Sequence, residues 1–159
     1  MARLMSARIV AAAIVSFAAA APAVAQSFAQ PFAKPEDAIA YRKAGFTVLG
    51  RHFGVVAAMA NGRIPWDAKV ASENADIALV VARLPYAGFL PGPERGGNTK
   101  AEPKIWTETA QFNAAAQKMQ DEMGKLAVAA KSGNQEQLRT QVGATGASCK
   151  ACHDSYRMQ

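Results

Sequence analysis

After residue 25 the sequence contains no apolar run of the roughly 20 residues that a membrane-spanning helix needs. From Pro35 onward no segment has the alternating pattern of a convincing strand, and nowhere do lysines and arginines form a basic run. Cysteine and histidine are scarce, with two of each. These absences exclude a membrane-embedded mature protein, and they argue against a β-rich fold and against nucleic acid as a partner.

The one long apolar run lies at the start of the chain. Arg3 and Arg8 precede it, and it ends in Ala23-Val24-Ala25, the small-x-small pattern that a signal peptidase cuts. We therefore expect residues 1–25 to be a signal peptide that directs export of the chain and is then removed. Residues 26–159 then form a mature protein of one domain, whose basic excess is small and scattered and which has no membrane contact.

Four segments have the apolar periodicity of helices, which predicts an all-α fold. The first begins at Pro35 and ends at Asn61-Gly62, the second runs from the N-cap Asp67 to Pro85, the third spans Lys104 to Lys131, and the fourth starts at the N-cap Asn134. The expected inward residues are Ile39, Phe46, Leu49, Phe53 and Val56; Val70, Ile77, Val81 and Leu84; Ile105, Phe112, Met119, Met123 and Leu126; and Leu138, Val142, Cys149, Cys152 and Tyr156. Mostly short connections predict an antiparallel four-helix bundle.

A long irregular segment separates the second predicted helix from the third. Residues 85–103 are rich in proline and glycine, so they cannot form regular structure over their whole length. Loops of this length inside compact domains are usually either functional or disordered. Tyr86 and Phe89, near its start, predict that at least this end packs against the rest of the domain.

The chemistry is concentrated near the C-terminus, in Cys149-Lys150-Ala151-Cys152-His153. A spacing of three places both sulfurs on one helical face, where each can bond one vinyl group of a haem. His153, four residues after Cys149, shares that face and is placed to coordinate the iron. The motif predicts one covalently attached haem c near the C-terminal end of the fourth helix.

Two other uses of the cysteines compete with haem attachment. A disulfide between Cys149 and Cys152 would fit a thioredoxin-like thiol-disulfide oxidoreductase, but that site needs a βαβ setting. A zinc site would need a fourth ligand in addition to these cysteines and His153. The all-helical pattern disfavours the first alternative, and the missing ligand disfavours the second.

A sixth iron ligand would have to come from another helix. The candidates are Met59, Met119, Met123 and His52. Met119 and Met123 fall on the apolar stripe of the third helix, where methionine is typically core filler. His52 falls beside the stripe of the first helix, which predicts a partly exposed side chain. Bis-histidine ligation stays open on these grounds.

The sequence resembles cytochrome c′, the class II c-type cytochromes, over essentially the whole mature chain. The residues that carry the resemblance are 32–38 (FAKPEDA), Tyr41-Arg42, residues 84–89 (LPYAGF), Ile105-Trp106 and residues 146–157 (GASCKACHDSYR). The family has its haem motif near the C-terminus of a four-helix bundle. Its members have a five-coordinate, high-spin haem with an apolar distal side, and the same is implied here.

The resemblance also implies roles for residues of the first predicted helix. Phe46 stands at the position that closes the distal side, where many relatives have leucine, and Arg42 and Lys43 would lie near the haem propionates. Many relatives have glutamine at the position of Lys43. Apart from the resemblance, Arg42 and Phe46 are four residues apart on one face and could meet one flat ligand, while solvated charge and plain core are the alternatives.

Further roles are implied for the long loop and the chain end. Tyr86 and Phe89 would line the haem, with Tyr86 where several relatives have tryptophan, and Arg157 would lie on the proximal side beside His153. Family members are commonly homodimers that pair through their first two helices. Val48 and Val55, which we expect to face outward, are compatible with such pairing.

The expected function is that of a periplasmic, non-enzymatic haem protein that binds nitric oxide, or carbon monoxide when reduced, and passes single electrons. An iron with one empty axial position accepts a diatomic ligand, and an apolar pocket offers bound oxygen no hydrogen-bond donor. The alternative is a six-coordinate electron carrier with Met59 or His52 as distal ligand. The sequence does not identify a redox partner.

Overall fold

The computed structural model describes residues 32–91 and 98–158, and the predicted signal peptide lies outside these residues. The four α-helices are α1 (Pro35–Ala60), α2 (Ala68–Val81), α3 (Thr109–Lys131) and α4 (Gln135–Tyr156). Two short 3₁₀ helices, η1 (Leu84–Gly88) and η2 (Pro103–Trp106), lie between α2 and α3. Within the described residues, no helix has the length and apolar character to cross a membrane.

The helix ends follow the predicted caps and turns. Pro35 occupies the first turn of α1. The side chain of Asp67 accepts a hydrogen bond from the Val70 N–H at 3.0 Å at the start of α2, and Asn134 caps α4 in the same way. Gly62 and Gly133 follow α1 and α3 with φ of 68° and 70°, a left-handed conformation that glycine adopts without steric cost.

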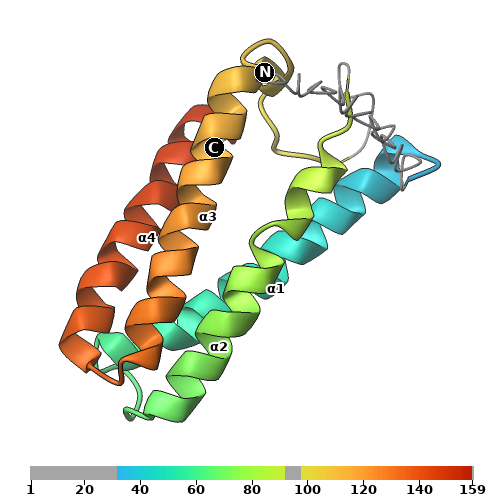
Figure 1. Cartoon of the computed structure of the whole chain (residues 1–159). Coiled ribbons are helices and arrows are strands. Elements are labelled where there is room, and N and C mark those ends of the chain that lie inside the picture. Colours follow the sequence, from blue (N-terminus) through green and yellow to red (C-terminus); the bar gives the residue numbers. More distant parts are fainter. Residues whose placement is uncertain (1–31, 92–97, 159) are drawn as a thin grey trace, which may run out of the picture.

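The helices form an antiparallel bundle in which consecutive helices run in opposite directions (Figure 1). The predicted fold class is therefore confirmed. Figure 1 shows α3 beside α4 and α1 beside α2, with the two pairs closest at the end where α3 turns into α4. Toward the C-terminal end of α4 the pairs separate. This difference between the two ends determines where the core and the site lie.

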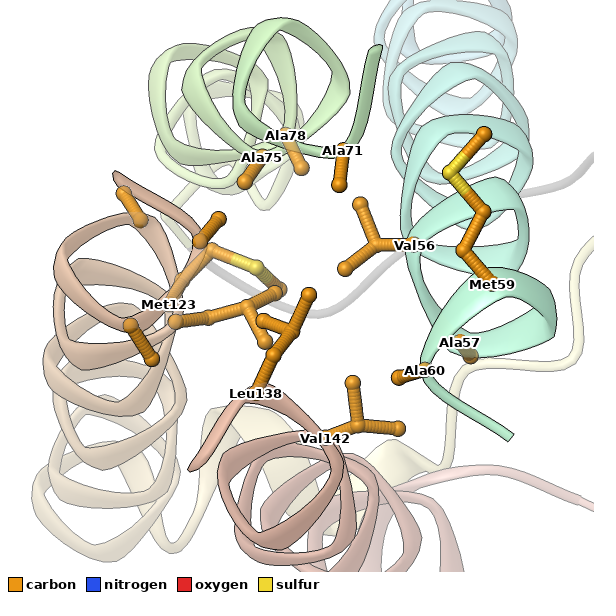
Figure 2. Packing of buried hydrophobic residues seen from close by; sticks show 14 of the residues in the cluster. Val56, Ala57, Met59, Ala60, Ala71, Ala75, Ala78, Met123, Leu138 and Val142 are labelled. Carbon is orange, nitrogen blue, oxygen red and sulfur yellow. The ribbon is translucent and has the colours of Figure 1, made fainter. Parts of the chain in front are cut away.

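The main core fills the closed end of the bundle. Val56, Met123, Leu126 and Leu138, which come from α1, α3 and α4, are completely buried. Figure 2 shows Met123 and Leu138 meeting Val56 at the centre of the cluster. Burial of such side chains is worth about 1.5–3 kcal/mol each relative to exposure, so this end holds the bundle together.

The prediction for the inner face of α2 is wrong for Ile77 and Leu84, whereas Val70 and Val81 do pack against the main core. Ile77 and Leu84 are 42% and 45% exposed, and Val70 and Val81 are only partly buried. The inward row consists of alanines, whose methyl groups point toward Val56 and Met123 in Figure 2. These are Ala71, Ala75, Ala78 and, just beyond the helix, Ala82. Small side chains allow α2 to approach α1 and α3 closely, whereas a row of valine and isoleucine would hold the helices apart.

The third helix begins later than predicted. Residues 103–106 form the separate 3₁₀ helix η2, and α3 starts only at Thr109. The side chains of Thr107 and Thr109 donate hydrogen bonds to Lys104 O and Ile105 O. These hydroxyl groups compete with backbone N–H groups for the carbonyls that a continuous helix would use.

On α1, Val48 faces outward as predicted, but Val55 is partly buried and packs on the main core.

Gly88, at the end of η1, lies against the backbone of α1. A Cβ atom at this position would be 2.5 Å from Ala38 O and 2.9 Å from Arg42 Cβ. We therefore expect Gly88→Ala to lower the free energy of unfolding by about 1–3 kcal/mol, because η1 must move away from α1. Gly54→Ala is the matched control, since Gly54 is helical with nothing within 4 Å of its added Cβ.

Urea unfolding of the two variants separates the effects. Gly54→Ala should raise the free energy of unfolding by about 0.5–1 kcal/mol, because alanine replaces glycine inside a helix. Equal stability of Gly88→Ala and the wild-type protein would show that η1 can shift without loss.

Candidate haem site

A cavity of about 850 Å³ occupies the end of the bundle where the helix pairs separate. Its walls come from α1, η1, residues 98–101, α3 and α4, and this volume is in the range of cofactor sites. The structure brings every site residue predicted from the sequence to this cavity: Arg42, Lys43, Phe46, Tyr86, Phe89, Cys149, Cys152, His153 and Arg157.

The three motif residues lie on one face of the last turns of α4. Cys149 and Cys152 are free thiols, so no disulfide joins them. Burial raises the pKa of both thiols, which are therefore protonated at neutral pH. Desolvation, followed by the positive charge of Arg157, lowers the pKa of His153. A lowered pKa favours the neutral imidazole, the form that coordinates a metal.

The zinc alternative requires a cluster of ligands. Among the described residues, no group of three or more His, Cys, Asp or Glu side chains is arranged to hold a metal ion. The thiols and the imidazole instead open onto a large cavity with apolar walls. This donor set and this shape fit a flat macrocycle bonded at its edge and coordinated from one side.

An aromatic cluster forms the wall that faces α4. Phe46 meets Tyr86 edge-on with ring centroids 5.9 Å apart, and Tyr86 stacks on Phe89 at 6.1 Å. Phe112 of α3 joins them, with its centroid 4.9 Å from that of Phe89. The rings fix one another, because aromatic pairs at these separations attract and leave little free space. Phe112 was predicted only as core, and its helical spacing contains no indication of a cavity.

Arg42 joins η1 to residues 98–101 through hydrogen bonds beside the cavity. Its guanidinium is buried and donates to Gly88 O at 2.8 Å and to Thr99 Oγ1 at 2.7 Å. It also lies 4.5 Å from the centre of the Phe89 ring, a cation–π distance. The exposed Lys43 ammonium donates to Asn98 O at 3.2 Å. Both cations stand where they could meet carboxylates of a bound group.

The segment around Ala101 closes the cavity against the end of α4. Ala101 and Arg157 form an isolated antiparallel bridge, and Met158 N donates to Lys100 O at 2.8 Å. This pairing places Arg157 beside His153. Sequence reasoning missed the contribution of residues 98–101, because nothing in two short irregular segments indicates that they pair.

The predicted candidates for a sixth ligand divide into two groups. His52 Nδ1 lies 2.8 Å from Asn74 Oδ1 of α2, and Met59 is buried in the main core; neither lines the cavity. Met119 and Met123 do line it, but both are buried members of the main core. As predicted, His52 is partly exposed.

Comparison with known proteins identifies the family. The family profile described as Cytochrome C′ matches residues 37–157. The chain belongs to the cytochrome c′ family. Cytochrome c′ from Rubrivivax gelatinosus is 46% identical over 126 residues, which are 79% of this chain and 98% of the relative. Cytochrome c′ from Alcaligenes xylosoxydans xylosoxydans is 43% identical over 126 residues, which are 79% of this chain and 97% of the relative.

Solved structures of the family have the same fold. The match with the crystal structure of the Rubrivivax gelatinosus cytochrome c′ covers 79% of this chain and 98% of the chain in that structure, with a TM-score of 0.76. A nitric oxide complex of a variant of the Alcaligenes xylosoxidans protein is 42% identical, with a TM-score of 0.75 over 80% of this chain and 98% of its own. In a member of this family, residues 149–153 are a haem c attachment motif.

Proposed function

We propose that this chain is a periplasmic haem c protein with a five-coordinate iron, which binds nitric oxide or carbon monoxide and passes single electrons without catalysing a reaction. The observation that carries the proposal is the cavity itself, with Cys149, Cys152 and His153 on α4 and an aromatic wall opposite. The haem supplies an iron that accepts one electron or one diatomic ligand. The protein supplies a single axial nitrogen, from His153, and an apolar environment.

The lining residues support an open axial position. Of the residues described along the cavity, His153 is the one histidine. Phe46 and Phe89 provide carbon surfaces on the opposite side, and Met119 and Met123 are held in the core. Nitric oxide as ligand is supported by the complex solved for the Alcaligenes xylosoxidans relative.

Location and assembly are parts of the same proposal. The pattern of residues 1–25 supports export to the periplasm. The outer faces of α1 and α2 carry exposed apolar side chains, with Val48 and Ile77 each 42% exposed and Val80 66% exposed. The His52–Asn74 contact joins the two helices about one turn from Val48 on α1 and from Ile77 on α2. We propose that a second copy covers this face in a homodimer, and that an unidentified redox partner binds elsewhere.

The spin state of the iron tests the open axial position. The ferric holoprotein at neutral pH should have a high-spin optical and electron paramagnetic resonance spectrum, because only one protein group coordinates the iron. Addition of nitric oxide should then change the optical spectrum of the ferrous protein, because the gas binds at the open axial position. A low-spin ferric spectrum that becomes high-spin in Met59→Leu or His52→Ala would contradict the proposal and establish the six-coordinate alternative.

A further inference from the structure

Among the hydroxyl groups along the cavity, the Tyr86 hydroxyl differs from the others. The other hydroxyls there have partners, since Thr47 donates to Lys43 O and Tyr156 donates to Glu108 Oε2. The Tyr86 hydroxyl has no hydrogen bond to any described residue. Each fully enclosed side-chain nitrogen or oxygen in the described residues does have a partner, so the Tyr86 oxygen is not completely enclosed by protein, and the residue lines the cavity.

The ring that carries this hydroxyl is held in place. Tyr86 lies on η1, after a completely buried Pro85, and stacks on Phe89 with an interplanar angle of 29°. Phe46 meets it edge-on, and Phe112 lies 6.0 Å away on the α3 side. Because of these contacts, the ring cannot change its orientation without disrupting the cluster.

The surroundings keep this hydroxyl a donor. Burial raises the pKa of Tyr86, so the phenol keeps its proton. Tyr86 packs on the main core together with Cys149 and on the cluster of Ile105, Phe112 and Tyr156 together with Cys152. Tyr86 and both cysteines line the cavity. A phenol O–H in an apolar space is unfavourable unless it finds an acceptor, and the neighbouring aromatic side chains offer none.

We propose that the Tyr86 hydroxyl donates a hydrogen bond to an oxygen acceptor of the group held in the cavity. Two acceptors share this chemistry, the propionate carboxylates of the haem and the oxygen atom of a bound diatomic gas. The gas case rests on the proposed function, and the propionate case requires only the haem. Tyr86 is in either case a positioning residue that adds one directed donor to an otherwise apolar wall.

Tyr86→Phe in the holoprotein tests this inference, because it deletes the hydroxyl and keeps the ring. Tyr41→Phe is the matched control, since Tyr41 lies on the outer face of α1 away from the cavity. If the gas is the acceptor, carbon monoxide should leave the ferrous Tyr86→Phe protein about two- to tenfold faster, the equivalent of one hydrogen bond. The carbon–oxygen stretching frequency should shift as well.

The second acceptor gives a different result. If a propionate is the acceptor, the carbon monoxide rates stay constant, while the propionate bending mode in the resonance Raman spectrum and the reduction potential shift in Tyr86→Phe. Unchanged vibrational modes, rates and potential in a folded Tyr86→Phe protein would overturn the inference. Those results would leave the proposed function intact, whereas a holoprotein that fails to bind either gas would contradict the proposed function without affecting the propionate case.

Exchange of the unaltered protein into D₂O gives a test that does not depend on a variant. Deuteration of the Tyr86 hydroxyl should shift the carbon–oxygen stretch or the propionate mode, whichever group accepts the hydrogen bond. Absence of any deuterium shift in both modes of the wild-type holoprotein would overturn the inference.

Discussion

Replacing both Cys149 and Cys152 by alanine is expected to change a haem that resists acid-acetone extraction into one that is removed completely. In the wild-type protein two thioether bonds hold the haem, and unfolding the chain does not break them. The double variant retains only the His153 ligand and the cavity walls, both of which are lost when the chain unfolds. The measurement is the haem absorbance left in the protein pellet after extraction.

The single variant Cys149→Ala is the matched control. It retains Cys152 and with it one possible thioether bond, so most of the haem should stay with the pellet. Full extraction of haem from correctly matured wild-type protein would contradict covalent attachment.

Phe46→Ala is expected to speed carbon monoxide binding to the ferrous protein and to tighten it about five- to a hundredfold. The Phe46 ring stands in the aromatic wall, edge-on to Tyr86 and 6.5 Å from Phe89, and lines the cavity. Displacement of such a ring by a diatomic ligand costs on the order of 1–3 kcal/mol in a packed wall. Removing the ring recovers that cost as affinity, which gives the expected factor.

The same substitution should lower the stability of the fold by about 3–5 kcal/mol, because it leaves a cavity. The effect on binding is steric, so it should appear for nitric oxide as well as carbon monoxide. Phe32→Ala is the control, since Phe32 packs on Tyr41 outside the cavity. Rates and affinities that stay at wild-type values in a folded Phe46→Ala protein would show that Phe46 is ordinary packing.

Features determined by local interactions could be predicted from the sequence. The caps Asp67 and Asn134 and the turn glycine Gly62 lie where predicted, because each satisfies backbone groups within a few residues. The spacing of Cys149, Cys152 and His153 likewise needs only one helical turn to bring them together. For Arg42 and Phe46, spacing indicated a shared face, and the family resemblance supplied the cavity.

Features determined by neighbouring elements could not be predicted in this way. Hydrophobic periodicity ranks isoleucine and valine above alanine, so it selected Ile77 on α2 instead of the alanine row that contacts α1 and α3. The bridge between Ala101 and Arg157 joins two segments without periodicity. The free hydroxyl of Tyr86 depends on the orientation of a ring in a cluster, which no one-dimensional pattern records.

The alanine row of α2 reverses the usual relation between the size of a side chain and its tolerance of mutation. On this helix the smallest apolar residues, such as Ala71 and Ala75, are completely enclosed, while Val80 is among the most exposed of the large ones. Adding a single methyl group to the inner row would force a neighbouring helix to move, whereas a larger side chain at position 80 would not disturb the core. We therefore expect relatives of this protein to keep glycine or alanine at these inner positions of α2.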